Sequence, residues 1–303
     1  MKKKLFGTDG IRGVANEYPI TPEVMIKLGR AIISSLPDSA KKKRILIGKD
    51  TRVSGEMIES PIAAGTDSMN GMAYLAGVIP TPGISCLTAS SGFDAGIVIS
   101  ASHNPYYDNG IKIFNHKGFK LSDQIEKGIE DKVLDESFIS NSLISKKIGI
   151  IKKYESTELQ YIEFLKKTLP QDYSLKGLKI ILDCSNGATY QVAPQLFEDL
   201  GAEVTTIFAS PNGININDQC GSQHTEILRE TVLKNNADIG LAFDGDGDRL
   251  IAVDNQGSEV TGDQILAVCA KFMKEKDQLA NNVVVSTVMS NVGLIQLFKE
   301  LEI

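Results

Sequence analysis

The chain is poor in the residues that several common kinds of site require. Of its 303 residues only three are histidine and four are cysteine. With so few histidines, the sequence offers few candidates for the base of a Ser-His-Asp triad. The cysteines are far apart, form no Cys-x-x-Cys pair and follow no secretory signal, so we expect reduced, buried thiols rather than a disulfide framework. They are Cys86, Cys184, Cys220 and Cys269.

Long apolar runs and an excess of basic charge are also absent. No apolar segment approaches the roughly 20 residues that cross a membrane, and the formal net charge of -6 argues against a nucleic-acid-binding surface. The sequence contains no Walker A motif, no Gly-x-Ser-x-Gly elbow and no His-Glu-x-x-His motif. We therefore expect a cytoplasmic protein with neither nucleic-acid nor membrane partners.

A recurring pattern indicates the fold class. Short apolar runs, typical of buried strands, lead repeatedly into polar loops of small residues, and helical patterns follow. The runs end at Ile47, Ile99, Leu182, Phe243 and Val285. This order predicts consecutive layered α/β domains. Residues 136–153 lack a clear period, so we expect a first domain boundary near residue 150.

The most informative loop follows the predicted strand Ala95 to Ile99 and carries Ser102. Pro105 forces the chain to turn after this serine. Ligands of open α/β sheets collect at the carboxyl ends of strands. Neighbouring side chains could donate hydrogen bonds or positive charge to an anion such as a phosphoryl group. These are His103, Asn104, Asn109 and Lys112.

Lys112 is the one candidate general acid or base in this segment, because burial or nearby cations can lower the pKa of a lysine into a working range. A serine hydroxyl alone is a poor nucleophile. The alternative interpretation is an ordinary Ser-His-Asn-Pro turn that ends a strand, since such residues are common in turns.

Two further loops could face the same site. Residues 6–13 are rich in glycine, so their backbone can approach a ligand closely, and Arg12 could hold a phosphate with two hydrogen bonds. An ordinary surface loop is the alternative. After the predicted strand at residues 44–48, Lys49 and Arg52 either point into the cleft of Ser102 or form ion pairs such as one with Asp50.

The second chemical pattern is the acidic loop Asp244-Gly245-Asp246-Gly247-Asp248-Arg249. In a plain strand the carboxylates would be about 7 Å apart, but the alternating glycines let the backbone curl until they converge. Acidic oxygen ligands without histidine or cysteine favour Mg²⁺. An EF-hand is excluded, because its sixth position would be Arg249 rather than glycine. A solvated acidic turn is the alternative.

Together the loops suggest a serine that carries a phosphoryl group and a magnesium ion that links this group to three aspartates. The motifs resemble those of the α-D-phosphohexomutases in Phe6 to Arg12, Ser100 to Pro105, Gly110 to Lys112 and Asp244 to Arg249. The opening loop and Tyr106 to Asn109 are most similar to bacterial members that interconvert glucosamine 6-phosphate and glucosamine 1-phosphate for cell-wall precursor synthesis.

The resemblance implies a role for each motif residue. Ser102 would be phosphorylated and would hold Mg²⁺ with Asp244, Asp246 and Asp248. Lys112 would transfer protons. The phosphoryl group and substrate would be bound by Arg12, His103 and Arg249, with Thr8, Asn104 and Asn109. The phosphoryl group would pass from Ser102 to the sugar phosphate, and the bisphosphate intermediate would return its other phosphoryl group. Glucosamine 1,6-bisphosphate or a kinase would prime Ser102.

The resemblance also implies consecutive three-layer α/β domains with mixed sheets. Residues 1–150 would carry the phosphoserine loop and residues 151–252 the metal loop. Residues 253–303 would form an incomplete third domain that includes a strand at Asn282 to Val285, and the family's fourth domain would be absent. A homodimer is possible. Mannose or glucose phosphates are alternative substrates, and a non-catalytic remnant that binds a phosphosugar or a protein partner is a further alternative.

Overall fold

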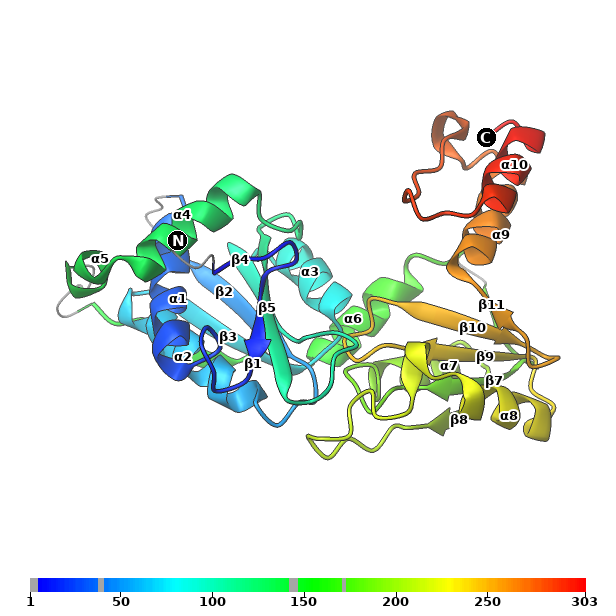
Figure 1. Ribbon diagram of the computed structural model, residues 1–303, viewed down its shortest axis with the longest axis horizontal. Helices are drawn as coiled ribbons and strands as arrows, with labels where there is room; N and C mark the ends of the chain where they lie inside the picture. Colours follow the sequence, from blue (N-terminus) through cyan, green and yellow to red (C-terminus); the bar gives the residue numbers. More distant parts are fainter. Residues whose placement is uncertain (1–4, 38–40, 142–146, 171–172) are drawn as a thin grey trace.

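The computed structural model describes residues 5–37, 41–141, 147–170 and 173–303. Two β-sheets with covering helices follow each other along the chain, and a smaller helical segment comes last (Figure 1). In the part of the chain that is described, no helix is both long and apolar enough to cross a bilayer.

The first sheet has six strands and is mixed. Their spatial order is β1 (Ile11–Val14), β5 (Asp108–Asn115), β4 (Ala95–Ile99), β2 (Arg44–Lys49), β3 (Met72–Val78) and β6 (Ile150–Lys153). The central pairs β4-β2, β2-β3 and β3-β6 are parallel, whereas β5 runs antiparallel to both β4 and β1. The parallel strands direct the ends of β2 and β4 toward the same edge.

Helices cover both faces of this sheet. One face packs against α1 (Pro22–Ser35), α2 (Gly55–Ser68) and α4 (Asp123–Leu134), which α5 (Glu136–Asn141) follows; the other packs against α3 (Thr81–Ser90) and α6 (Thr157–Lys166). Successive strand residues point to opposite faces. Accordingly, Ile45 and Ile47 of β2 join the first core, while Leu46 between them joins the second.

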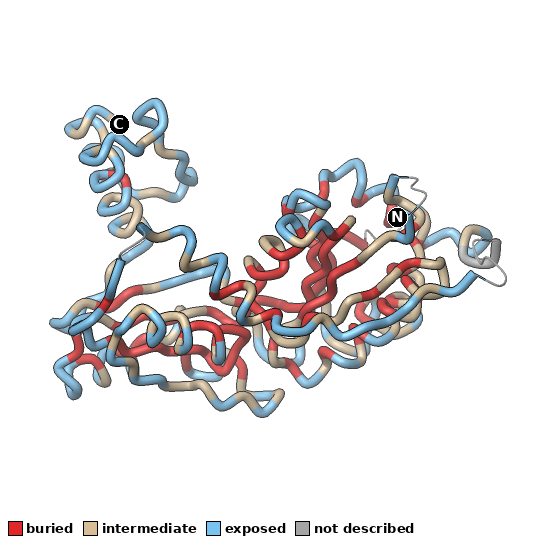
Figure 2. Tube along the Cα trace, turned by 180° about the vertical axis from the view of Figure 1, so that it is seen from behind, coloured by how far each residue is buried: buried red, intermediate tan, exposed pale blue. Residues whose placement is uncertain are grey.

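The second sheet has five strands. Their order is β11 (Glu259–Val260), β10 (Leu250–Asp254), β9 (Ile239–Phe243), β7 (Lys179–Asp183) and β8 (Glu203–Ile207). Helix α7 (Val192–Asp199) covers one face and α8 (Glu226–Asn235) the other, with the short helix η1 (Gly221–Gln223) before α8. Both sheets have buried interiors, as Figure 2 shows in red.

The last segment differs from the sheets in its exposure. It contains α9 (Gly262–Glu275), η2 (Ala280–Asn282) and α10 (Val292–Glu300), and most of its residues are exposed or half-buried (Figure 2). The strand predicted at Asn282 to Val285 is wrong, because the backbone after η2 is irregular and Val285 is 88% exposed. An apolar run forms a strand only where a neighbouring strand pairs with its backbone.

The structure confirms the expected α/β class with mixed sheets and helices on both faces. The pattern missed α5 and β6, both within residues 136–153. The first sheet runs on to Lys153 and β10 to Asp254, past the residues 150 and 252 where we expected boundaries. All four cysteines are free. The expectation of burial is confirmed for Cys184 and Cys220, but Cys86 is only half-buried and Cys269 is exposed.

Candidate active site

Ser102 lies just after β4, where the edge of the first sheet meets the second. Its backbone is left-handed, with φ of 53°, and the residue is 1% exposed. The Ser102 hydroxyl donates a 2.6 Å hydrogen bond to Oδ2 of Asp244, which follows β9. The two polar loops that the sequence singled out are therefore in direct contact.

A buried network holds the Ser102 turn in place. The Ser100 hydroxyl donates to Oδ2 of Asp50 at 2.5 Å and accepts from the Ser102 backbone N–H at 2.9 Å. Arg52 pairs with the same Asp50 oxygen at 2.8 Å. Because the backbone N–H and the neighbouring side chains are fixed, the position of the Ser102 oxygen is fixed as well.

Arg52 and Asn217 hold the carbonyl side of the turn. Arg52 donates to the carbonyl oxygens of Ser102 at 2.8 Å and Asn104 at 3.0 Å. Asn217, from the second sheet's long loop, donates to the same two oxygens at 2.9 and 3.1 Å. Arg52 thus both faces the Ser102 loop and pairs with Asp50. Lys49 instead pairs with Glu56 at 2.7 Å and with Glu59.

The three aspartates of the acidic loop converge. Ligand oxygens of Asp244, Asp246 and Asp248 all lie within 4.8 Å of one another. Burial, followed by the charges of Asp246 and Asp248, raises the pKa of Asp244 to about 7. Oδ1 of Asp246 is buried and has no hydrogen-bond partner. Such a set is costly without a cation and could hold one.

Lys112 lies against this cluster from β5. Its Nζ is 3.1 Å from Asp248, 3.4 Å from Asp246 and 3.4 Å from Asp9. Burial acts to lower the pKa of Lys112, but the nearby carboxylates outweigh it and raise the pKa. The expectation of a lowered pKa is therefore wrong for this arrangement, because the carboxylates of Asp246, Asp248 and Asp9 surround the ammonium group.

Three further cationic or polar groups gather around Ser102. Nδ1 of His103 is 3.4 Å from the Ser102 hydroxyl and 2.7 Å from Nη1 of Arg249. Burial, together with the charges of Arg249 and Arg12, lowers the pKa of His103. Arg12 contacts the Ala101 carbonyl at 3.4 Å and pairs with Asp9 at 2.9 Å. Cationic and polar side chains therefore lie beside the Ser102 turn.

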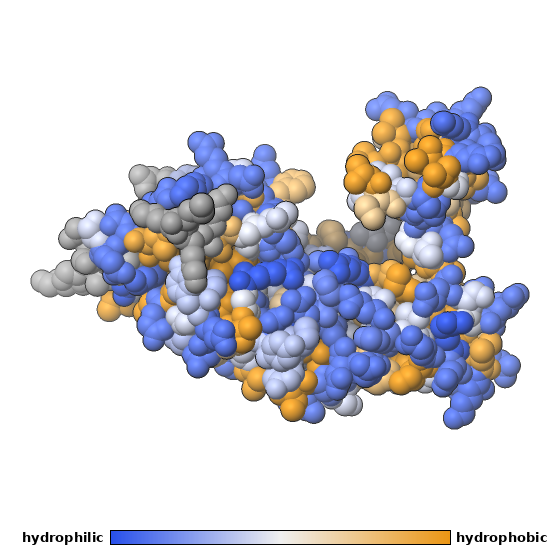
Figure 3. All heavy atoms as spheres, in the orientation of Figure 1, coloured by the Kyte–Doolittle hydropathy of each residue, from blue (hydrophilic) through white to orange (hydrophobic). Residues whose placement is uncertain are grey.

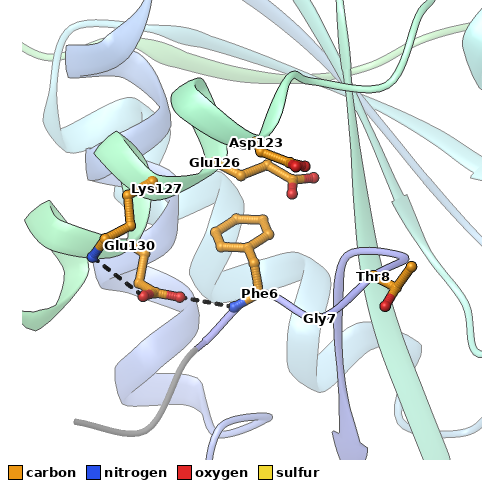
Figure 4. Close-up of a pocket in the computed structure, with 7 residues that line it drawn as sticks. All are labelled: Phe6, Gly7, Thr8, Asp123, Glu126, Lys127 and Glu130. Atoms are coloured by element: carbon orange, nitrogen blue, oxygen red, sulfur yellow. Dashed lines mark hydrogen bonds and ion pairs between the residues drawn. The ribbon is translucent and has the colours of Figure 1, made fainter.

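The remaining predicted residues lie less directly at the hydroxyl. The Asn109 amide is buried and donates to Ser54 at 2.8 Å, and Asn104 donates to Asp108 at 2.9 Å. Thr8 is exposed and lines a separate cavity of about 490 Å³ with Phe6, Gly7 and the first turns of α4 (Figure 4). The Thr8 carbonyl accepts a hydrogen bond from Lys120 at 2.6 Å.

Sequence reasoning missed several residues at the site. Asn217 comes from a loop without a distinctive pattern, whereas Asp9 lies in the glycine-rich loop at residues 6–13, in which only Arg12 and Thr8 were assigned roles. Thr81 could have been found, because it lies three residues after the end of strand β3 and so repeats the pattern of a strand that leads into a polar loop. Its hydroxyl donates to Oδ2 of Asp246 at 2.6 Å.

This arrangement suits the transfer of an anionic group. A serine oxygen, a cluster of acidic oxygens and several cations lie around one point at the junction of the two sheets. Cationic and metal groups stabilise the charge of a transferring phosphoryl group.

Family models for phosphoglucomutase/phosphomannomutase match almost the whole chain. The α/β/α domain I model matches residues 3–140, domain II matches 159–257 and domain III matches 261–303. The chain is 54% identical to phosphoglucosamine mutase of Syntrophus aciditrophicus over 99% of this chain and 67% of that protein. It is 56% identical to phosphoglucosamine mutase of Syntrophobacter fumaroxidans over 96% of this chain and 65% of that protein.

The chain thus spans about two thirds of the length of the curated relatives it matches. Among solved structures, a phosphoglucomutase/phosphomannomutase family protein of Burkholderia thailandensis superposes with a TM-score of 0.76 at 26% identity, covering 90% of this chain and 59% of that one. Aspergillus fumigatus N-acetylphosphoglucosamine mutase, in complex with GlcNAc-6P and magnesium, shares the fold with a TM-score of 0.57 at 16% identity. The superposition covers 98% of this chain and 60% of that one. The motifs, the two sheets and these matches show that the chain belongs to the phosphoglucomutase/phosphomannomutase family.

Proposed function

We propose that this chain carries the phosphoserine and metal-binding parts of a phosphoglucosamine mutase, which interconverts glucosamine 6-phosphate and glucosamine 1-phosphate. The observation that carries the proposal is the 2.6 Å contact between the Ser102 hydroxyl and Asp244, one of three converging aspartates. Relatives that are more than half identical and bear this name support the choice of sugar.

The residues present fit a magnesium ion. Asp244, Asp246 and Asp248 offer hard oxygen ligands, and a phosphoryl group on Ser102 would offer another. The unpartnered Oδ1 of Asp246 supports this assignment. A bound Mg²⁺ supplies charge stabilisation for the transferring phosphoryl group.

The chain's own residues then have separate tasks. The bond from phosphorus to the Ser102 oxygen breaks while a sugar hydroxyl oxygen bonds to phosphorus. The hydroxyl proton passes to the neutral amine of Lys112, which we assign as the base and which has first given its ammonium proton to solvent. Arg12, His103 and Arg249 orient and stabilise the anionic group. The second transfer reverses these changes with the other phosphoryl group of the bisphosphate and restores phosphoserine.

We further propose a phosphoserine domain built on the first sheet, a metal domain built on the second sheet and part of a third domain after them, with the boundaries moved from residues 150 and 252 to the ends of β6 and β11. Priming of Ser102 by glucosamine 1,6-bisphosphate or a kinase, a cytoplasmic location and a homodimer are part of the same proposal. The Tyr106-Tyr107 spacer favours glucosamine over mannose or glucose phosphates.

The test is transfer of a labelled phosphoryl group from glucosamine 1,6-bisphosphate to the protein, with and without Mg²⁺. We expect magnesium-dependent labelling of the 303-residue chain that Ser102→Ala abolishes. Ser137→Ala is the control, because Ser137 is an exposed serine of α5, and it should label like the wild type. In parallel reactions, labelled glucose and mannose bisphosphates replace the glucosamine compound as the phosphoryl donor.

Labelling that persists in Ser102→Ala would contradict the assignment of the phosphorylated serine. Faster labelling from the glucose or mannose bisphosphate would contradict the choice of sugar. A folded chain that binds Mg²⁺ and is not labelled would favour the non-catalytic remnant.

A further inference from the structure

Thr81 connects the first sheet's helices to the acidic loop of the second sheet. It is the first residue of α3 and is 6% exposed. Its backbone N–H donates to the Asp246 carbonyl at 2.9 Å, and its hydroxyl donates to Oδ2 of Asp246 at 2.6 Å. Two bonds from one residue therefore fix both the backbone and the carboxylate of Asp246.

The two carboxylate oxygens of Asp246 consequently differ. Oδ2 accepts from Thr81 and lies 3.4 Å from Nζ of Lys112. Oδ1 is buried without a hydrogen-bond partner. Since a buried carboxylate oxygen without a partner is costly, its retention indicates that this oxygen serves a ligand. The Thr81 bond stops the carboxylate from turning and exchanging the two oxygens.

The start of α3 adds to this effect. The helix begins beside Asp246, and its dipole favours a negative charge there. Pro82 in the first turn is compatible with a helix start. The Asp246 carboxylate therefore lies beside the positive end of the α3 dipole.

We propose that Thr81 is a positioning residue that orients Asp246 for a divalent cation. The inference rests on the metal site of the proposed function. It adds to that site the Thr81 hydroxyl, which holds a metal ligand without binding the metal. Groups that orient metal ligands typically contribute 10–100-fold to metal affinity. Thr81 itself is not a ligand.

Joining the two sheets would be a purely structural role for Thr81, but other bonds already do this. The Thr51 hydroxyl donates to the Asn186 carbonyl at 2.6 Å, and the Val53 N–H donates to the Gly213 carbonyl at 2.8 Å. Loss of the Thr81 hydroxyl leaves these contacts in place. Its effect should therefore fall on the carboxylate rather than on the assembly of the sheets.

The experiment measures Mn²⁺ affinity by electron paramagnetic resonance titration of the 303-residue chain, with Mn²⁺ as a probe for hard oxygen ligands. Thr81→Val keeps the shape and removes the hydroxyl, and we expect about tenfold weaker binding. Thr81→Ser restores the hydroxyl and should bind within about threefold of the wild type. Thr88→Val is the matched control, because Thr88 is a buried threonine of α3 whose hydroxyl bonds to the Ile84 carbonyl; its Mn²⁺ affinity should not change.

Equal Mn²⁺ affinity in Thr81→Val and wild type, with weaker binding in Asp246→Asn, would overturn the inference and leave the proposed function intact. Weakening by Thr81→Ser as large as by Thr81→Val would also overturn it, because the hydroxyl is present. Unchanged binding in Asp246→Asn would instead overturn the metal site, and both proposals with it. Circular dichroism checks folding, and Thr81→Ala replaces Thr81→Val if the valine variant is unfolded.

Discussion

Gly245 illustrates how closely the acidic loop approaches the Ser102 turn. A Cβ at this position would lie 2.6 Å from the Ser102 carbonyl oxygen and 2.7 Å from the Asn217 amide nitrogen. Both groups belong to the network that holds Ser102. A side chain at residue 245 would therefore push apart the two loops that form the candidate site.

We expect Gly245→Ala to lower the free energy of unfolding by about 1–3 kcal/mol and to slow phosphoryl transfer to Ser102 strongly. Gly262→Ala is the matched control, since a Cβ there meets nothing within 4 Å. Urea unfolding and the labelling assay measure the two effects. Wild-type labelling by Gly245→Ala would show that the close approach is not needed for transfer.

Asp183, the last residue of β7, introduces a pH dependence through a carboxylate outside the acidic loop. Its carboxylate is fully buried and accepts from the backbone N–H groups of Ser185 and Gly221, both at 2.8 Å. Burial raises the pKa of Asp183 to about 6, against the opposing effect of these hydrogen bonds. Because the folded pKa exceeds the unfolded one, folding takes up a proton between them, and this contribution to stability is lost as pH rises through 6.

Lowering the pH from 7 to 5 should therefore add about 1 kcal/mol to the unfolding free energy through Asp183. The Asp183→Asn variant cannot take up this proton. Between pH 7 and pH 5 its unfolding free energy should therefore rise by about 1 kcal/mol less than that of the wild type. Urea unfolding of both proteins at the two pH values gives the difference. Parallel pH profiles would show that Asp183 does not titrate in this range.

Helices α1 and α2 pack with their backbones in close contact. A Cβ on Gly29 would lie 2.3 Å from the Ile62 carbonyl oxygen, and one on Gly65 would lie 2.2 Å from the Ile26 carbonyl oxygen. The glycines reduce intrinsic helix propensity, yet they allow the two helices to cover one face of the first sheet together.

Gly65→Ala should destabilise the protein by about 3 kcal/mol, because the helices must separate. Gly128→Ala is the informative contrast, since a Cβ on this α4 glycine meets nothing within 4 Å. It should stabilise by roughly 0.5–1 kcal/mol through helix propensity alone. Thermal and urea unfolding would contradict this account if both variants changed stability in the same direction.

The elements differ in how well local sequence predicts them. Strands β2 and β4 were predicted to within one residue, because their apolar runs are strong. Strand β6 has four exposed residues and exists through its pairing with β3, so its sequence shows no buried pattern. The apolar run Val283 to Val285 shows the reverse case, in which the apolar pattern is present but no described strand pairs with it.

The final segment gives the molecule an exposed apolar surface. Val288 is 101% exposed, Met289 85% and Val292 77%. Figure 3 shows hydrophobic residues at the surface of this part of the molecule. Contiguous exposed apolar residues promote association in water.

Replacement of Val288, Met289 and Val292 by lysine should reduce self-association, measured by sedimentation velocity under reducing conditions because Cys269 is exposed. Lysines at Asn255, Gln256 and Gln278 add the same charge at exposed polar positions and form the control. An equal reduction in both variants would show that net charge, not the apolar surface, governs association.

The order of strands and loops and the identity of the chemical motifs were readable from the chain, because periodicity, turn residues and glycine spacing act over a few neighbouring positions. Which of those motifs contact one another in the folded molecule could not be read from the chain. Ser102 contacts Asp244 across 142 positions of sequence, and Thr81 contacts Asp246 across 165. Such contacts depend on how two sheets and their helices pack, which no local pattern specifies. For the same reason the carboxylates that raise the pKa of Lys112 emerged only in the folded molecule.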